Sequence, residues 1–289
     1  MEENQFRDWL GQYTDPAACL EAFAARKSFF RVNALKANPD TFKTDIPCKR
    51  TDYYPAAYEI TGDIEIGRSW EYFLGYIYPQ SMPSIMVSTV LNPSQEDVVL
   101  DVAAAPGSKF SHMAMLMCNG GVLVGNDYKK EKISALYSTI NRMNMLNCIV
   151  TMRDGKKLDW KERFTKVLLD APCTALGSGP SAAKRWAPEH SKMIATTQKK
   201  MIFSAYDALV SGGEMVYSTC TYAREENEEV VKSLLENVPS ASLLDVGLDI
   251  PHEKGLSDYG DEFRKVCRIY PQHLQSEGFF IAKIRKGEQ

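Results

Sequence analysis

The sequence lacks the features of several protein classes. No CxxC pair and no His/Cys cluster occurs in the 289 residues, so we expect no metal site. The seven cysteines are an odd number without regular spacing, which argues against a disulfide framework. No stretch reaches the roughly 18 uninterrupted apolar residues of a membrane span. We therefore expect reduced thiols in a cytoplasmic protein with no membrane association.

Signals for targeting and for nucleic-acid binding are also weak. The stretch MEENQFRDWLGQYTD is polar and acidic, unlike a secretory signal or a transit peptide. The formal net charge is -3, so the whole chain does not indicate a nucleic-acid partner. Basic pairs such as Lys129-Lys130 and Lys156-Lys157 would form an electrostatic footprint only if they converged on one side. Solvated helix and loop faces are the alternative interpretation.

From Asp97 onward, short apolar runs alternate with helical segments. The runs have the near-continuous apolar character of strands buried on both faces of a parallel sheet: DVVLDVAAA, GVLVGND, CIVTMRD, KVLLDAP and GEMVYSTC. Helices are expected over residues 108–117, 129–144 and 188–210. This alternation predicts a doubly wound α/β domain over residues 86–289, with VCRIYP and GFFIAKIRK adding two strands at one edge.

Residues 1–85 have a different pattern. A helical start from Phe6 to Ala25 precedes FFRVNALK, which is typical of a strand. A polar stretch then leads into EYFLGYIYPQSMPSIMVSTVL. We expect a small α+β appendage that feeds a helix packed on the main sheet.

Four of the predicted strands finish with an aspartate, namely Asp101, Asp127, Asp154 and Asp170. One such aspartate is usually a turn former or a helix cap. Four in succession favour an acidic rim, because ligands of open α/β sheets bind at the carboxyl ends of the strands. The first turn, AAAPGSK, is neither GxGxxG nor a phosphate loop, since Phe110 follows the lysine.

An acidic rim repels a pyrophosphate and suits a cofactor with a positive centre and a ribose. Asp127 lies 20 residues after Gly107 (127 minus 107), the usual place for a carboxylate that accepts from ribose hydroxyls. Asp154, one strand further, is placed for an adenine amino group. S-adenosylmethionine therefore fits this rim better than NAD or ATP.

Two cysteines follow the fourth and fifth of these strands. Cys173 lies in DAPC and Cys220 in STC. In the common methyltransferase strand order these strands are neighbours, about 4.8 Å apart, so both thiols should flank one crevice. The remaining cysteines are expected to be inert packing residues: Cys19, Cys48, Cys118, Cys148 and Cys267.

Paired thiols beside a methyl donor suit methylation of a weakly nucleophilic carbon such as cytosine C5. A thiolate that adds at C6 activates C5, and a base later removes the C5 proton. A helix beginning near Arg224 is expected to place its N-terminus close to Cys220, an arrangement that favours a thiolate, and the acidic residues nearby leave the net effect open. Nearby acidic side chains should favour that helix start and partly oppose the thiolate: Glu225, Glu226, Glu228 and Glu229.

At these residues the sequence resembles the RsmB/Sun-type family of RNA cytosine-5 methyltransferases. Members carry a PC motif and a TC motif, here DAPC and STC followed by Glu226-Asn227-Glu228. The resemblance extends through RVNALK, GYIYPQSMPS, LDVAAAPGSK, NRMNMLN, RWAPEHSKMI and GFFIAKIRK. Phe110 departs from the small hydroxyl residue that is usual there, and the extra RNA-binding domain of some members is not seen.

The resemblance implies a role for each site residue. Cys220 attacks C6, Cys173 assists product release, Asp170 holds the cytosine edge, and Lys109 lines the catalytic pocket. The implied S-adenosylmethionine site consists of Ala103, Ala104, Ala105, Pro106, Gly107, Ser108, Lys109, Asp127, Asp154 and Asp170. The implied fold is a Rossmann-like class I methyltransferase domain with an RNA-recognition-like N-terminal module.

The expected partner is RNA, and we expect the protein to bind it as a monomer. Because the extra RNA-binding domain is not seen, tRNA is the favoured substrate. Alternatives that stay open are rRNA as substrate and a catalytically idle RNA-binding or assembly factor on the same fold. A DNA cytosine methyltransferase is disfavoured by the TC motif. Trp186, beside Lys184-Arg185, is a candidate for holding the unstacked cytosine, with simple packing as the alternative.

Overall fold

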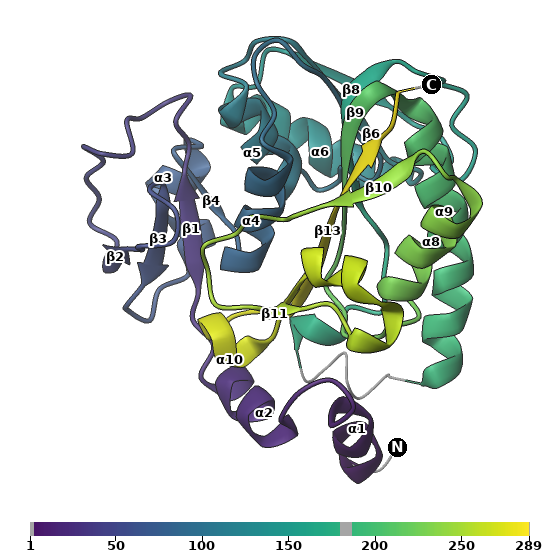
Figure 1. The fold of residues 1–289 in the computed structure, drawn as a ribbon. Coiled ribbons are helices and arrows are strands. Elements are labelled where there is room, and N and C mark those ends of the chain that lie inside the picture. Colours follow the sequence, from purple (N-terminus) through teal and green to yellow (C-terminus); the bar gives the residue numbers. More distant parts are fainter. Residues whose placement is uncertain (1–2, 180–186, 289) are drawn as a thin grey trace.

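Two sheets organise the chain. The computed structural model describes residues 3–179 and 187–288. A large mixed sheet carries helices on both faces, and a small antiparallel sheet lies beside it (Figure 1). The doubly wound α/β class predicted from the sequence is therefore confirmed.

The larger sheet has nine strands in the described part of the chain. Its order is β11-β12-β13-β9-β8-β5-β6-β7, and β10 pairs with β13. The strands from β5 to β9 pair in parallel, whereas β13 runs antiparallel to β9, β10 and β12. The bounds are β5 Val98–Asp101, β6 Val122–Asn126, β7 Cys148–Thr151, β8 Phe164–Asp170, β9 Leu209–Thr219, β10 Ala241–Leu244, β11 Glu253–Lys254, β12 Cys267–Ile269 and β13 Phe279–Lys286.

The two strands expected at the end of the chain are β12 and β13, and they pair as predicted. The sequence did not predict β10 and β11. Strand β11 has only two residues, both charged and exposed, so its sequence carries no apolar pattern. It exists because its backbone pairs with β12.

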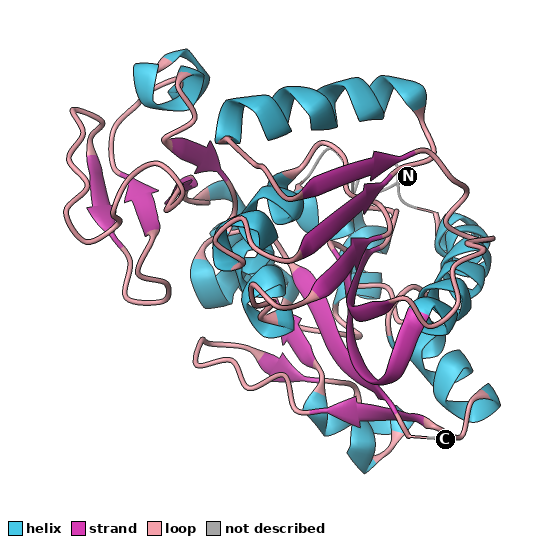
Figure 2. Cartoon of the chain, turned by 90° about the horizontal axis from the view of Figure 1, so that it is seen from above, coloured by secondary structure: helices cyan, strands magenta, loops and turns pink. Residues whose placement is uncertain are grey.

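Helices cover both faces of the larger sheet, as Figure 2 shows from above. Alternate strand residues enter opposite cores: Val99 packs in the core that includes α4 and α5, and Leu100 packs with α8 and α9. The predicted helices are all present. Their bounds are α4 Met82–Leu91, α5 Ser108–Leu116, α6 Lys130–Met143, α8 Pro188–Ala208 and α9 Glu228–Asn237.

The N-terminal region contains four short antiparallel strands and three helices. The sheet order is β2-β3-β1-β4, with bounds β1 Phe29–Val32, β2 Cys48–Arg50, β3 Ala57–Ile60 and β4 Ile77–Pro79. The helices are α1 Glu3–Leu10, α2 Pro16–Ala24 and α3 Trp70–Phe73. The single helical start expected over Phe6 to Ala25 was wrong in one respect: it is two helices. Asp15 accepts a hydrogen bond from the Ala17 N–H at 2.9 Å and caps the second.

Several short helical turns complete the fold. A four-residue helix, α10 Pro271–Leu274, packs against α2 at the lower end of the view in Figure 1. The 3₁₀ turns are η1 Ile66–Arg68, η2 Leu176–Ser178, η3 Ser257–Tyr259 and η4 Asp261–Lys265. In the described ranges, none of the helices is long and apolar enough to cross a membrane.

A buried arginine joins the small sheet to the larger part of the fold. Arg31 of β1 is fully buried and donates to Gln80 at 3.0 Å and to Ser111 of α5 at 3.0 Å. Burial lowers the pKa of Arg31 to about 10. The boundary predicted after residue 85 falls inside α4, so the two regions share a continuous helix.

Glu214 of β9 joins three strands of the larger sheet. Its carboxylate accepts from Lys166 of β8 at 3.1 Å, and from Lys283 at 3.1 Å and Arg285 at 2.9 Å on β13. Burial alone would raise its pKa, but the lysines outweigh burial and lower the pKa to about 2. The folded state therefore favours the ionised form of Glu214.

We expect Glu214→Gln to destabilise the fold by about 1–2 kcal/mol near pH 7. Because the folded pKa is depressed, the contribution is complete above the unfolded pKa of roughly 4.3 and fades as the pH falls toward the folded value. Thermal unfolding followed from about pH 7 to about pH 3 measures this difference. The control is Glu236→Gln, which removes an exposed pair with Lys232 on α9. An equal effect of both variants at each pH would contradict the prediction.

Candidate active site

Two thiols meet at the carboxyl ends of β8 and β9. These strands pair in parallel with Asp170 opposite Ser218, so Cys173 and Cys220 leave the sheet side by side. The two Sγ atoms are 3.3 Å apart and share a hydrogen bond. Both cysteines are free and half-buried. The strand order used in the sequence analysis is thus the one that the structure has.

The environment of Cys173 disfavours its thiolate. Its hydrogen bond with Cys220, its burial and the nearby Glu226 carboxylate raise its pKa well above the usual range. Cys173 is therefore protonated at neutral pH, and either sulfur can be the donor in the hydrogen bond between the two thiols.

An ion pair lies next to the thiols. Lys109 of α5 donates from Nζ to Asp170 Oδ2 at 2.7 Å, and Ser218 donates from Oγ to Asp170 Oδ1 at 2.8 Å. The Lys109 Nζ also lies 5.1 Å from the centre of the Phe279 ring. Burial opposes the charge on Lys109, but Asp170 outweighs burial and raises the lysine pKa. Asp170 is thus held as an ionised acceptor at the edge of the crevice.

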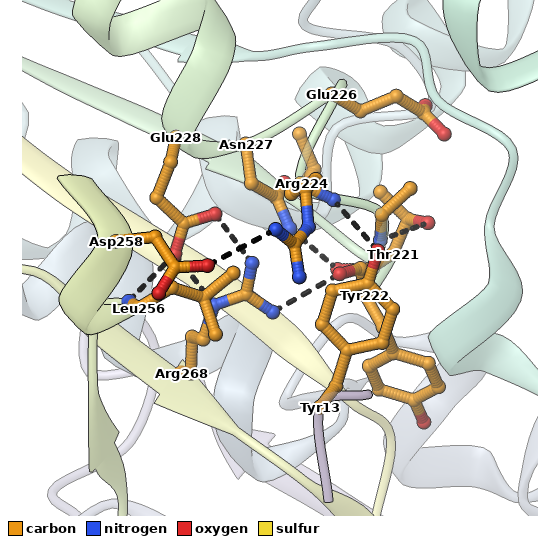
Figure 3. A network of polar contacts seen from close by, with 12 residues as sticks. Tyr13, Thr221, Tyr222, Arg224, Glu226, Asn227, Glu228, Leu256, Asp258 and Arg268 are labelled. Atoms are coloured by element: carbon orange, nitrogen blue, oxygen red, sulfur yellow. Dashed lines mark hydrogen bonds and ion pairs between the residues drawn. The ribbon is translucent and has the colours of Figure 1, made fainter. Parts of the chain in front are cut away.

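The turn after Cys220 differs from the expectation. The helix predicted near Arg224 begins at Glu228, so the preceding residues form a turn. Glu226 and Glu228 are fully buried and do not act as solvated charges at a helix start. Figure 3 shows Glu228 turned toward Arg268, whereas Glu226 points to the other side of the turn. Burial of these charges depends on partners distant in the sequence, which the local pattern does not reveal.

A cavity of about 220 Å³ opens beside the first turn of the sheet. Ala103, Asp127 and Asp154, which the sequence analysis assigned to the cofactor site, line it. Val102, Gly155, Pro172 and Met201 line it too, and the sequence analysis missed them. A Cβ on Gly155 would lie 2.9 Å from the end of Met201 and 3.0 Å from Val102, so only glycine keeps this wall close.

The other residues assigned to the cofactor site do not line this cavity. Ala104, Ala105 and Gly107 are buried beneath the turn, while Pro106 is exposed and Ser108 is half-buried at the start of α5. Lys109 and Asp170 lie on the side of the thiols. Of the four aspartates expected to form an acidic rim, only Asp127 and Asp154 line the cavity.

Asp101, at the end of β5, does not line this cavity. It is 1% exposed, and burial together with Asp170 raises its pKa to about 8. The sequence pattern could not separate this buried carboxyl from Asp127, because both end a strand. The departure at Phe110 is absorbed by the core: the ring is fully buried, and a Cβ at Gly125 would lie 2.8 Å from it.

The cavity fits S-adenosylmethionine. Asp127 is 5% exposed, and its Oδ2 atom has no hydrogen-bond donor among the described residues, with Lys132 Nζ at 3.7 Å. A buried carboxylate oxygen without a donor is satisfied by a ligand hydroxyl. Asp154 lies on the same cavity, and the turn has no phosphate loop. A ribose hydroxyl and an adenine amino group match these two carboxylates.

The comparison with known proteins identifies the family. The family described as 16S rRNA methyltransferase RsmB/F matches residues 88–285. This chain belongs to that family. The resemblance found in the sequence is confirmed, and the reaction class is S-adenosylmethionine-dependent cytosine-5 methylation of RNA.

Individual RsmB/F-type relatives differ in length. The chain is 38% identical over 275 residues to a tRNA (cytosine(49)-C(5))-methyltransferase of Pyrococcus abyssi, covering 89% of this chain and 87% of the relative. It is 37% identical over 288 residues to ribosomal RNA small subunit methyltransferase F of Aliivibrio fischeri, covering 93% of this chain but 59% of that relative. A crystal structure of a methyltransferase homologue from Pyrococcus horikoshii has a TM-score of 0.84 and 29% identity, with 99% and 95% coverage.

The remaining cysteines and the basic segment around Trp186 were also singled out in the sequence. Cys19 and Cys267 are buried and Cys48 and Cys148 are half-buried, but Cys118 is exposed and is not a packing residue. Lys184, Arg185 and Trp186 lie outside the described residues. Within residues 3–179 and 187–288, no group of three His, Cys, Asp or Glu side chains could hold a metal ion.

Asp127→Asn should weaken S-adenosylmethionine binding about tenfold or more, because a neutral amide replaces the carboxylate acceptor for a ribose hydroxyl. Isothermal titration of the purified chain with the cofactor measures this change. Cys220→Ser is the control, since this thiol does not line the cavity and should leave cofactor affinity unchanged. Equal affinity of Asp127→Asn and wild type would place the ribose elsewhere.

Proposed function

We propose that this chain methylates C5 of a cytosine in tRNA, with Cys220 as the nucleophile and Cys173 as the group that assists release. The observation that carries the proposal is the pair of Sγ atoms 3.3 Å apart beside the Lys109–Asp170 ion pair. Two thiols at this separation can both reach one pyrimidine ring. A single packing cysteine would need neither the second thiol nor the ion pair.

The electrostatics assign different roles to the two thiols. The raised pKa of Cys173 keeps it protonated, so it does not compete as a nucleophile. Cys220 Sγ, as thiolate, forms a bond to C6 of the cytosine, and the electron pair of the C5–C6 double bond moves toward C5. The Asp170 carboxylate accepts from the cytosine amino group and orients the ring, while Lys109 holds Asp170 in place.

When bound, S-adenosylmethionine supplies an electrophilic methyl group to C5. The Cys173 thiol first gives its proton to solvent, and its thiolate then takes the C5 proton. The C5–H electron pair forms the C5–C6 double bond again, and the Cys220 Sγ–C6 bond breaks with its electron pair returning to the sulfur as thiolate. The hydrogen bond with Cys220 is the largest cause of the raised Cys173 pKa. That hydrogen bond weakens once the Cys220 sulfur is bonded to carbon, so Cys173 becomes more acidic when a base is needed. Formation of the Cys220–C6 bond thus lowers the pKa of Cys173.

The similarity to a tRNA methyltransferase supports tRNA as the substrate. The Pyrococcus abyssi tRNA methyltransferase aligns over 87% of its length, whereas the Aliivibrio fischeri rRNA enzyme extends well beyond the aligned region. The family description and the 37% identity to the rRNA enzyme make rRNA the second candidate.

We also propose that the two regions of the chain have different roles. Residues 1–85 form the RNA-binding appendage, and residues 86–289 form the catalytic domain that acts as a monomer. The small β2-β3-β1-β4 sheet supports this division, because it forms its own core around Phe30, Val32 and Ile77. The shared helix α4 keeps the appendage in register with the catalytic part.

Cys220→Ser should abolish methylation of RNA while the affinity for the cofactor stays near wild type. Unmodified total tRNA and naked 16S rRNA are each incubated with methyl-labelled cofactor, then digested to identify the labelled nucleoside. Label in 5-methylcytidine from tRNA, with wild type alone, supports the proposal. Label from rRNA only would replace tRNA as the substrate, and label with Cys220→Ser would remove Cys220 as the nucleophile.

Cys173→Ala should trap a covalent protein–RNA adduct, because the release step loses its assisting thiol. Denaturing gel electrophoresis with labelled RNA detects the adduct as a band that requires both the cofactor and Cys220. The matched control is Cys118→Ala, since this cysteine is exposed and distant in sequence from both motifs. Turnover of Cys173→Ala at the wild-type rate without an adduct would contradict its role.

A further inference from the structure

Glu226 contacts the segment that carries Cys173 through several hydrogen bonds. Its Oε2 atom accepts from the Thr174 backbone N–H at 2.9 Å, and its Oε1 atom accepts from the Thr174 hydroxyl at 2.6 Å. Gln198 of α8 donates from Nε2 to Glu226 at 3.2 Å and to the Pro172 carbonyl at 2.9 Å. The residues before and after Cys173 are therefore both held by this group.

Asn227 contacts the segment that carries Cys220. It donates from Nδ2 to the Thr221 carbonyl at 3.0 Å and accepts on Oδ1 from the Thr219 hydroxyl at 2.5 Å. These partners are the residues on either side of Cys220. Asn227 is fully buried, so no water competes for these bonds.

The third residue of the same run anchors the turn to the sheet. Glu228 is fully buried and accepts from Arg268 of β12 in an ion pair, with its Oε1 at 2.6 Å from Nε (Figure 3). Arg268 also donates to the Tyr222 carbonyl at 3.0 Å. The turn is thus fixed at Tyr222 and Glu228, on either side of Glu226 and Asn227.

We propose that Glu226 and Asn227 are two separate positioning residues, one for each thiol: Glu226 holds the Cys173 segment, and Asn227 holds the Cys220 segment. The inference rests on the proposed function, in which the two thiols act at different steps. Because the two residues are adjacent in one anchored turn, the turn sets the relative positions of the two thiols. Loss of either contact should therefore impair a different step of the same reaction.

The chemistry of each side chain makes the roles testable with isosteric variants. Three donors converge on the Glu226 carboxylate, so Glu226→Gln must turn an amide NH₂ toward at least one of them. Asn227→Asp turns a carboxylate oxygen toward the Thr221 carbonyl, where the amide NH₂ now donates. Both changes keep the volume of the side chain and remove one oriented contact.

Glu226→Gln should leave the first methyl transfer within about threefold of wild type and slow release about tenfold or more, since small displacements of a reacting group carry such costs. The adduct then accumulates, as with Cys173→Ala. Asn227→Asp should slow formation of the adduct about tenfold or more, without accumulation. Rapid-quench measurement of methyl transfer to tRNA and denaturing gels for the adduct separate the two steps.

Glu225→Gln is the matched control, because it lies in the same turn, is half-buried and removes the same charge. It should match wild type in both steps. If Glu226→Gln does not fold, Gln198→Leu removes the donor to Glu226 and to the Pro172 carbonyl and should show the same slow release. Thermal unfolding of each variant identifies those that fold.

The outcomes separate this inference from the proposed function. Glu226→Gln and Asn227→Asp variants that fold and impair both steps equally would overturn the separate roles. Trapping by Cys173→Ala together with normal release by Glu226→Gln would overturn the inference and leave the proposed function standing. Normal release by Cys173→Ala would overturn the proposed role of Cys173, and with it the inference.

Discussion

The parallel pairing of β8 with β9 is the constraint on which the active site depends. Asp170 lies opposite Ser218 in this register, and both cysteines follow within a few residues. Neighbouring strands are only about 4.8 Å apart, so any two residues that leave them together are forced into contact. The sheet therefore brings the two segments together, and the turn that carries Glu226 and Asn227 holds the thiols at the 3.3 Å separation. A shift of one residue would turn one thiol to the other face of the sheet.

Each buried charged side chain near this strand pair contacts either an opposite charge or several hydrogen-bond donors. Lys109 and Asp170 neutralise each other at 2.7 Å, and Glu228 is matched by Arg268. Within the described residues, Glu226 is paired with no cation and accepts from three neutral donors, with burial raising its pKa. A buried group of this kind is costly unless every contact is made, so its neighbours are held in one arrangement. The same contacts that stabilise the carboxylate thereby fix the Cys173 segment.

The sequence predicted those features that repeat locally and missed those that depend on distant partners. The apolar runs around Val99 and Leu168 predicted buried parallel strands, and the strand order then placed Cys173 beside Cys220. The run of glutamates after Cys220 looked like a helix start, because nothing local shows that Thr174 and Gln198 surround Glu226. Which of two strand-ending aspartates faces the cavity also depends on strand twist and neighbouring helices.

In the proposed reaction, the hydrogen bond between the two thiols sets the order of the steps. While Cys220 is free, its hydrogen bond with Cys173 holds the second thiol in its protonated form. When Cys220 forms a bond to carbon, its sulfur loses much of its capacity to accept, and the main cause of the raised Cys173 pKa is removed. Acidity therefore rises at Cys173 only after an adduct exists. A pair of thiols in contact can thus prevent premature proton removal without any movement of the backbone.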